Sequence, residues 1–145
     1  MPAIIRQPKE KDLMHLTRYA IEFPQPSNLK NNEWMRERKF WAADRLLDDD
    51  DVKKLLIAES GGKMVGYIYG VIHEQKDGEI QEIYVDEFYR REGIGTCLYQ
   101  ALVDWMSEEG TEVVNLSAPV GSEKIEKLMT SLGFKPVGKV YQKYL

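Results

Sequence analysis

The sequence predicts an α+β (mixed α/β) fold with a mostly antiparallel central sheet, and two observations carry that prediction. Three segments rich in β-branched and aromatic residues follow one another through short turns, which is the pattern of an antiparallel meander. The segments are Val52–Glu59, Met64–Ile72 and Glu79–Val85, and the turns are Gly61-Gly62 and Asp77-Gly78. The helix after Gly95 then leads to a fourth strand, Glu112–Ala118, and a connection of that length implies a parallel strand pair.

The first third of the chain is predicted to supply a short strand and two helices. Ala3–Arg6 is the strand candidate. Asp12 is a suitable N-cap for the first helix, because its side chain can accept a hydrogen bond from the first turn. That helix carries Leu13, Leu16, Tyr19 and Ala20. Pro24 and Pro26 end it in a loop, and the second helix is expected over Asn32–Leu47.

Two amphipathic helices are predicted in the second half of the chain. On the first of them, apolar residues recur at the spacing of one helical face, which indicates packing on the sheet. These residues are Ile94, Leu98, Ala101, Leu102 and Trp105. The other helix begins after Ser122, a favourable N-cap, and ends at Gly133. The remaining tail, Phe134–Leu145, forms either one strand or a hairpin around Val137-Gly138.

Length, composition and charge restrict the class of protein. The chain has 145 residues, 43% of them apolar and 30% charged, which suits a single domain over residues 1–145 that buries roughly two-thirds of its unfolded surface. The net charge of −4 gives no general support to a nucleic-acid partner. The single cysteine excludes an internal disulfide, and no Cys/His cluster predicts a metal site. Because no membrane span or signal peptide is evident, we expect a cytoplasmic protein without a membrane partner.

The loop between the third strand and the following helix has the features of an anion site. Gly93 and Gly95 let a ligand approach the helix start, where free N–H groups and the positive end of the helix dipole favour phosphate. Arg90 and Arg91 add two positive charges directly before them. The alternative is an ordinary strand-to-helix turn with a solvated basic pair. The spacing matches neither the Walker pattern nor the dinucleotide fingerprint.

In its spacing and context, this loop resembles the acetyl-CoA-binding signature of the GNAT superfamily of N-acetyltransferases. That signature is Arg/Gln-x-x-Gly-x-Gly/Ala, and Arg90, Gly93 and Gly95 match it. A downstream strand, a helix ending in Leu132-Gly133-Phe134 and a final strand region match the rest of the family's core. The first half of the chain matches only in the order of its elements. The resemblance implies helices on both faces of the sheet and a splayed parallel strand pair.

In these enzymes acetyl-CoA, the co-substrate, lies between the two splayed strands, and no metal takes part. The resemblance implies that its pantetheine arm pairs with Glu79–Val85, and that the Ile83 backbone N–H serves as oxyanion donor to the thioester carbonyl. The pyrophosphate would rest on N–H groups of residues 91–96. The residues assigned to the coenzyme in this way are Ile83, Tyr84, Val85, Arg90, Arg91, Glu92, Gly93, Ile94, Gly95, Thr96 and Ser122.

The acceptor amine must lose a proton before it attacks, because an amine of pKa about 10.4 is almost entirely protonated at neutral pH. Two strand carboxylates are candidates for the base. Glu79 stands where histone-acetylating members have theirs, and Glu82 is the second. Simple alternation puts Glu79 and Ile83 on one face and Glu82 on the other, and a bulge would reverse that argument. Each of them is also compatible with an ordinary exposed strand carboxylate.

Two positions depart from the family's pattern. Many members carry Asn at the position of Ser122 and, at the position of Met129, a Tyr that protonates the leaving thiolate. Methionine cannot donate a proton, and losing a positioned acid slows such a step by roughly 10²–10⁴-fold unless another group replaces it. Tyr141, Tyr144 or water are the candidates. A coenzyme thiol of pKa about 8.5 is also a tolerable leaving group unaided.

The other reactive side chains are given structural interpretations. Cys97 is expected to be a packed small residue rather than a nucleophile, and His15 and His73 are expected to be structural or exposed. Asp48–Asp51 forms either a solvated turn or an attractive rim for a cationic amine. Relative to the family the tail is short, which leaves room for a strand from a partner chain and hence for a homodimer.

The sequence therefore predicts an N-acetyltransferase that moves an acetyl group from acetyl-CoA to a primary amine of a small molecule or peptide. The main alternative, from another class, is a non-catalytic acyl-CoA-binding or sensing module of the same fold, which Met129 favours. A protein-modifying enzyme is a third option. The acceptor is not specified, because the segment Pro24–Asp51 carries no recognisable motif.

Overall fold

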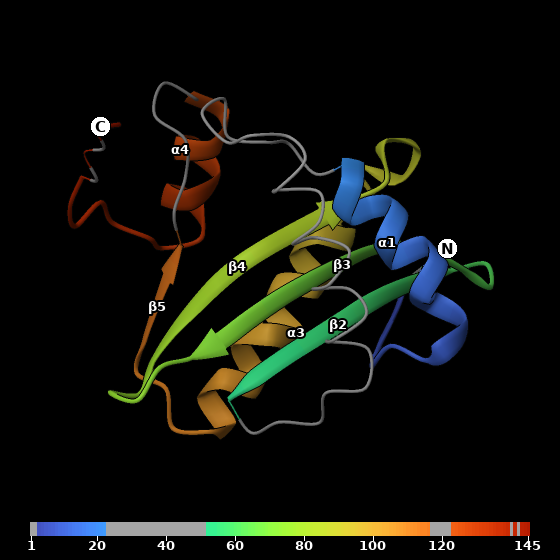
Figure 1. Ribbon diagram of the computed structural model, residues 1–145, viewed down its shortest axis with the longest axis horizontal. Coiled ribbons are helices and arrows are strands. Elements are labelled where there is room, and N and C mark those ends of the chain that lie inside the picture. The colour runs from blue at the N-terminus through green and yellow to red at the C-terminus, as the bar shows by residue number, and fades with distance from the viewer. Residues whose placement is uncertain (1–2, 23–51, 117–122, 140, 142) are drawn as a thin grey trace.

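The computed structural model describes residues 3–22, 52–116, 123–139, 141 and 143–145, and these contain a five-stranded mixed sheet (Figure 1). Its strands are β1 (Ile4–Arg6), β2 (Lys53–Ser60), β3 (Lys63–Ile72), β4 (Asp77–Val85) and β5 (Val113–Leu116). They lie side by side in sequence order. All neighbours are antiparallel except β4 and β5, which are parallel. The predicted fold class is confirmed.

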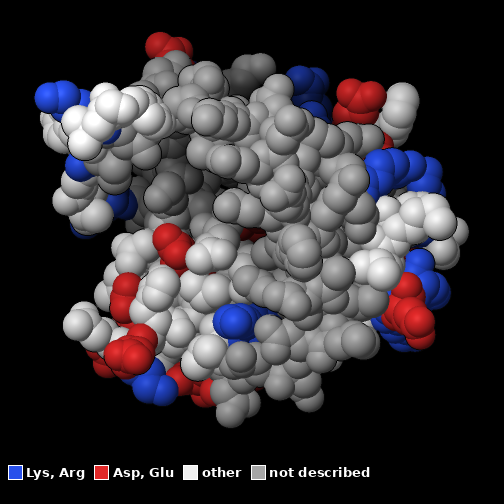
Figure 2. Space-filling model, in the orientation of Figure 1, with Lys and Arg blue, Asp and Glu red and all other residues white. Residues whose placement is uncertain are grey.

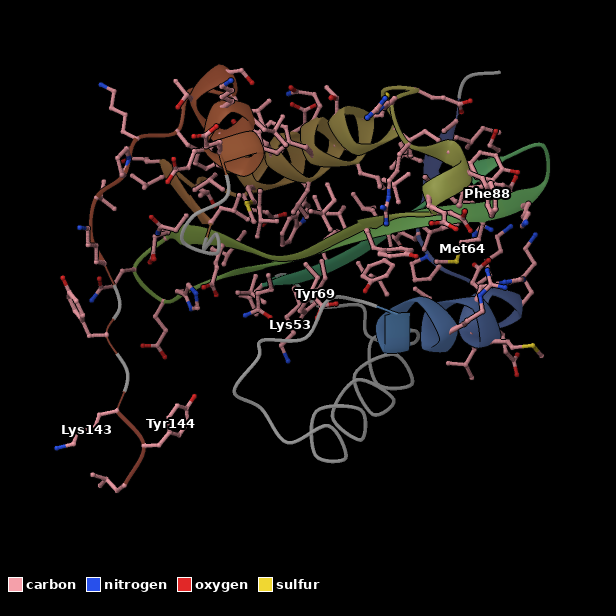
Figure 3. The ribbon with its side chains drawn as sticks, turned by 90° about the horizontal axis from the view of Figure 1, so that it is seen from above. Lys53, Met64, Tyr69, Phe88, Lys143 and Tyr144 are labelled. Atoms are coloured by element: carbon pink, nitrogen blue, oxygen red, sulfur yellow. The ribbon has the colours of Figure 1, made fainter. Side chains whose placement is uncertain are left out.

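Helices cover both faces of this sheet. They are α1 (Leu13–Glu22), α3 (Ile94–Glu108) and α4 (Glu123–Ser131), with short 3-10 turns η1 (Glu10–Asp12) and η2 (Glu87–Tyr89). Helix α1 lies on one face, whereas α3 and α4 lie on the side of the other face (Figure 3). None of the helices in the described part of the chain is long and apolar enough to cross a membrane. The helix predicted over residues 32–47 lies outside the described residues.

One of the two predicted turns is confirmed and the other is wrong. Gly61 and Gly62 join β2 to β3 with φ angles of 58° and 79°, the combination that favours glycine in a tight hairpin. Asp77 and Gly78 belong to β4 instead, and the turn lies just before them. Gly78 is needed inside the strand because an ideal Cβ there would lie 2.7 Å from the sulfur of Met106.

The sheet face beneath α3 is filled by apolar side chains. Its buried residues are Ala58, Val65, Ile68, Ile72, Ile80, Ile94, Leu98, Leu102 and Met106. Helix α3 approaches the sheet so closely that an ideal Cβ on Gly70 would lie 2.7 Å from a methyl carbon of Leu102. Most of the predicted helical stripe is therefore confirmed. Ala101 and Trp105 are only partly buried, and Met106 takes the innermost place in the last turn.

The face beneath α1 has a core of a different kind, made of Leu16, Leu55, Ile57, Met64, Tyr67 and Tyr69. Asp12 is not the N-cap of α1, because the chain already enters the turn η1 at Lys9. It is buried instead, and its carboxylate accepts hydrogen bonds from Arg6 at 2.8 and 3.0 Å and from the Lys9 N–H at 2.6 Å. Arg6 also donates to Glu59 at 3.0 Å, which ties β1, η1 and β2 together.

These contacts set the ionisation of Asp12. Burial alone would raise the pKa of its carboxyl group, but hydrogen bonds from Arg6 and from the Lys9 backbone favour the charged form. The net result is a pKa below the ordinary value for aspartate.

The tail after α4 differs from the prediction. The described residues between Phe134 and Leu145 contain no strand. Phe134 packs edge-on against Tyr99 of α3, with ring centroids 6.1 Å apart, but Val137 and Tyr141 are 90% and 86% exposed.

Candidate active site at the splayed end of β4

Strand β4 loses its parallel neighbour halfway along its length. The ladder with β5 begins at Asp77 opposite Val113 and ends at Ile80 opposite Leu116. Leu116 is the last residue described on β5, whereas β4 continues past Ile80 to Val85 (Figure 1). The edge of β4 over residues 81–85 therefore has no strand partner on this side among the described residues. The predicted parallel pair is confirmed, and this edge presents backbone groups of β4 that a ligand can pair with.

The pairing of β3 with β4 is irregular at the same place. Tyr69 lies opposite Glu82, but the next residue, Gly70, lies opposite Ile80. Gln81 is therefore an additional residue in β4, a β-bulge. The bulge falls immediately after the last residue that pairs with β5, so β4 changes its geometry where the described ladder with β5 ends.

The bulge places the two candidate bases on one face of the sheet. Residues that lie directly opposite each other in a ladder share a face. Glu79 lies opposite Val71 and Glu82 lies opposite Tyr69, and both of these partners belong to the α1 face. The prediction from simple alternation, which separated Glu79 from Glu82, is wrong because it assumed an unbroken strand.

Glu82 is the more enclosed of the two carboxylates. It is only 6% exposed, and its Oε2 accepts a hydrogen bond of 3.0 Å from the hydroxyl of Tyr67. Tyr67 is itself fully buried on β3. A buried carboxylate with a fixed donor is a common feature of functional sites, whereas an ordinary strand carboxylate faces solvent. The interpretation of Glu82 as an exposed strand residue is therefore wrong.

Glu79 has a different environment, at the closed end of the splay. Its Oε1 lies 3.3 Å from Nε2 of His73 and 3.1 Å from the side-chain amide nitrogen of Gln81. Both Glu79 and His73 are substantially exposed to solvent. The contact with His73 was missed because the two residues lie on different sides of a turn. Only the strand pairing brings them together.

The backbone of Ile83 is directed toward the open edge of β4. The Asp86 N–H donates to the Val65 carbonyl of β3 at 2.8 Å, and successive N–H groups alternate between the two edges of a strand. Counting back, the N–H of Ile83 points away from β3, past the end of the described ladder with β5. This orientation is the one that the predicted oxyanion donor requires.

Arg90 contacts the end of the same edge of β4. Its Nε donates to the Val85 carbonyl at 2.8 Å, and its guanidinium lies 5.6 Å from the centre of the Tyr84 ring. The Tyr84 ring in turn stacks on Tyr67 at 6.1 Å with an interplanar angle of 25°. One series of contacts therefore connects Arg90 with Glu82 through Tyr84 and Tyr67.

The start of α3 forms a cradle of backbone N–H groups. Its first helical hydrogen bond runs from Cys97 to the Gly93 carbonyl, and no side chain caps the preceding turn. Arg91 and Gly93 have φ angles of 68° and 82°, which turn the chain sharply into the helix. An ideal Cβ on Gly95 would have no neighbour closer than 3.9 Å. The surface above this turn is therefore open, as a phosphate group needs.

The two ends of β4 differ in their charged side chains. Arg90 and Arg91 follow its last residue, interleaved with Asp86, Glu87 and Glu92. At its other end, the β3–β4 turn, the start of β4 and the residue before β5 carry Glu74, Asp77, Glu79 and Glu112. Acidic side chains gather over this end of the molecule, at the lower left of Figure 2. The acidic start of β4 suits a ligand that carries a cationic group.

Several predicted site residues are not brought to β4. Tyr144 lies on the tail, well away from the sheet (Figure 3), so it does not replace the proton donor missing at Met129. Cys97 is exposed, which makes its interpretation as a packed residue wrong. Ser122 and Asp48–Asp51 lie outside the described residues.

Comparison with known families and sequences agrees with this geometry. A family model described as the acetyltransferase (GNAT) family matches residues 16–134. An uncharacterised N-acetyltransferase of Methanocaldococcus jannaschii is 29% identical over 112 residues, which are 73% of this chain and 47% of that protein. An N-alpha-acetyltransferase of Sulfurisphaera tokodaii is 39% identical over 100 residues, 61% of this chain and 59% of that protein. The chain thus spans only about half of the length of these two relatives.

Solved structures share the fold over nearly the whole chain. The protein AAC(6')-Iy, solved with the bisubstrate analogue CoA-S-monomethyl-acetylneamine, superposes with a TM-score of 0.75 and 18% identity over 100% of both chains. The PaiA N-acetyltransferase of Thermoplasma acidophilum, solved with coenzyme A, gives a TM-score of 0.77 and 18% identity over 93% of this chain and 91% of that one. At these identities the likeness establishes the fold.

Proposed function

The chain belongs to the acetyltransferase (GNAT) family, and we propose that it is an N-acetyltransferase that transfers the acetyl group of acetyl-CoA to a primary amine by direct attack. One observation carries the proposal. The bulge at Gln81 follows the last residue of β4 that pairs with β5, and three elements lie along the short stretch that begins there. These elements are the buried carboxylate of Glu82, the outward N–H of Ile83 and the uncapped start of α3.

The residues present fit the coenzyme, which when bound supplies an acetyl group activated as a thioester. The N–H groups of Ile94, Gly95 and Thr96 precede the first helical hydrogen bond, so they are suited to hold the pyrophosphate. The exposed side chain of Arg91 adds charge beside them. The open edge over residues 81–85 offers backbone partners to the amides of the pantetheine arm.

Glu82 is the base in this proposal, acting through a water molecule, and Glu79 is the weaker candidate. Glu82 lies next to the Ile83 N–H, just beyond the last residue of β4 that pairs with β5. Its carboxylate accepts a hydrogen bond from the Tyr67 hydroxyl. Glu79 still pairs with β5 through its backbone and shares its carboxylate with His73 and Gln81. We assign it to the acidic end of β4, where it favours the approach of a cationic amine.

The proposed step balances as follows. Glu82 removes a proton from the ammonium group, and the nitrogen then forms a bond to the acetyl carbon while the Ile83 N–H stabilises the charge on the carbonyl oxygen. The carbon–sulfur bond breaks, the nitrogen gives its second proton to water, and the thiolate takes a proton from water, because Met129 cannot supply one. Ammonium and thioester are converted into amide, thiol and one released proton.

The acceptor is proposed as a primary amine of a small molecule or of a peptide. The Sulfurisphaera tokodaii relative is named an N-alpha-acetyltransferase, and the Acidimicrobium ferrooxidans relative is named a mycothiol acetyltransferase. The panel should therefore include peptides, aminoglycosides, polyamines and amino acids. The homodimer predicted from the short tail stays a prediction, and light scattering of the purified protein tests it.

The first experiment tests the coenzyme site. Acetyl-CoA should raise the melting temperature of the wild-type protein by mass action. Gly95→Asp should abolish that shift, because it places a carboxylate beside the pyrophosphate, whereas the new Cβ itself would make only ordinary contacts. A folded Gly95→Asp variant that shifts as much as the wild type would show that the phosphate site is elsewhere.

The second experiment tests the base by coenzyme thiol release. Glu82→Gln should lower kcat/KM by roughly 10²-fold or more at neutral pH, with coenzyme binding intact. The deficit should shrink as the pH approaches the amine's own pKa, because free amine then becomes available. Glu79→Gln is the matched control on the same strand and face, and we expect it to change kcat/KM less than about fivefold.

The outcomes separate the competing assignments. A large loss at Glu79 with none at Glu82 would move the base to Glu79, as the resemblance first implied. If neither matters, the proton leaves through water alone. If the protein binds acetyl-CoA but acetylates nothing on the panel, it is the non-catalytic binding module.

A further inference from the structure

We infer that Tyr67 is a positioning residue that fixes the carboxylate of Glu82 in its working orientation and favours its ionised form. The inference rests on the proposed function, because it gives Glu82 the role of base. It goes beyond that proposal in naming a residue on β3, outside the coenzyme-binding signature, as part of the catalytic arrangement.

The contact depends on the bulge in β4. Tyr67 lies opposite Tyr84 in the ladder, and Glu82 lies opposite Tyr69. Tyr67 therefore reaches Glu82 along the diagonal between neighbouring pairs on one face, which is within range of a long side chain. In a regular strand, Glu82 would point toward α3 and this contact would be lost. The bulge thus brings Glu82 onto the face that carries Tyr67.

Tyr67 is suited to hold another group in place because it is itself immobilised. Its ring is fully buried and stacks on the ring of Tyr84, which Arg90 covers at 5.6 Å. Its hydroxyl donates to Oε2 of Glu82 at 3.0 Å. A donor fixed in this way limits the rotation of the carboxylate. It also stabilises the charged form, which is the form that accepts a proton.

The test is Tyr67→Phe, which removes the hydroxyl and keeps the ring. Without the donor, Glu82 should titrate at a higher pH, so the acid limb of the pH profile of kcat/KM should move up by about one pH unit. One pH unit below the wild-type limb, kcat/KM should therefore fall about tenfold, with the Kd for acetyl-CoA changed less than twofold. A purely structural role would lower the rate at all pH values without moving the limb.

The matched control is Tyr69→Phe. Tyr69 is also buried on the α1 face, two residues from Tyr67 along β3, and removing its hydroxyl should leave the acid limb in place. An equal shift in both variants would overturn the inference, since the limb would then respond to any polar change on this face.

A direct titration keeps the inference testable without activity. The carboxyl carbon of Glu82 can be followed by ¹³C NMR in the wild type and in Tyr67→Phe, with Glu82→Gln used to assign the signal. We expect the midpoint to rise by about one pH unit in Tyr67→Phe, and an unchanged midpoint would overturn the inference. If Glu82→Gln keeps full activity, the base assignment fails. Glu82→Gln could instead be inactive while Tyr67→Phe changes neither the acid limb of the pH profile nor the midpoint of the Glu82 titration. In that case only the role of Tyr67 fails.

Discussion

The two faces of the sheet are built from different side chains. Beneath α3, the buried residues from β2, β3, β4 and α3 are all apolar. The α1 side contains both buried charged residues of the described chain, Asp12 and Glu82, together with the buried tyrosines Tyr67 and Tyr69. Both faces belong to the same strands, so the alternation of side chains along β3 and β4 separates an apolar layer from a polar one.

This difference assigns different tasks to the two faces. Burying apolar surface contributes most of the stability of a small domain, and the α3 face does this without any buried charge. Burying a carboxylate is unfavourable unless hydrogen bonds compensate for the lost water. On the α1 face the partners are present, Tyr67 for Glu82 and Arg6 for Asp12. The stability of the α3 face therefore allows the α1 face to hold reactive groups.

The largest effect is expected from Leu102→Ala on the α3 face. Leu102 is fully buried against β3 and β4, and truncating such a residue leaves a cavity that lowers the free energy of unfolding by about 3 kcal/mol. Urea denaturation measures this loss. The acetylation rate per folded molecule should stay within about twofold of the wild type, because the residue touches none of the proposed site.

Glu82→Gln provides the reverse case. It should lower the rate strongly while changing the free energy of unfolding by less than about 1 kcal/mol, because the amide oxygen can still accept from Tyr67. If Leu102→Ala impaired the rate per folded molecule as much as Glu82→Gln, the separation of tasks between the two faces would be wrong.

An intermediate effect is expected at Asp12, which shows that a buried charge on the α1 face can be structural. Asp12→Asn should lower the free energy of unfolding at pH 7 by about 2 kcal/mol, less than for a fully buried pair because Arg6 keeps Glu59. Since the pKa of Asp12 is lowered by folding, its contribution is complete above the unfolded pKa of about 3.9 and is lost as the pH falls through the folded value.

Urea denaturation at pH 7 and pH 3 tests the sign. The difference in the free energy of unfolding between wild type and Asp12→Asn should be smaller at pH 3 than at pH 7. Glu10→Gln, an exposed carboxylate in the same turn, should change stability by less than about 0.5 kcal/mol at either pH. If the difference in the free energy of unfolding were the same at both pH values, the charge of Asp12 would contribute nothing to stability.

The sequence predicted the features that depend on local pattern. The strands, the stripe on α3 and the glycine loop were recognisable because each is determined by neighbouring residues. The bulge at Gln81 was not predictable, since it is a property of the pairing between two strands and its consequence for Glu82 follows only from that pairing. The contacts of Asp12 with Arg6 and of Glu79 with His73 also depend on tertiary neighbours. The acceptor stays unspecified because residues 23–51 lie outside the described part of the chain.

The smallest expected effect on stability is also the sharpest test of the coenzyme site. Gly95 lies in the first turn of α3, and its φ is outside the region that favours glycine. Its ideal Cβ would meet only Val85 at 3.9 Å and Ile83 at 4.0 Å, which are ordinary contacts. Gly95→Ala should therefore stabilise the fold by about 0.5 kcal/mol, because alanine favours the helix and restricts the unfolded chain.

The same methyl group stands between the pyrophosphate and the backbone N–H groups. Affinity for acetyl-CoA, measured by calorimetry, should fall about tenfold in Gly95→Ala although the apo protein melts slightly higher. A general loss of folding cannot produce these opposite signs, so the two measurements together isolate the role of the backbone at the helix start. Unchanged affinity would mean that no ligand approaches Gly95 closely. The open turn at the start of α3 would then be a strand-to-helix connection without a phosphate.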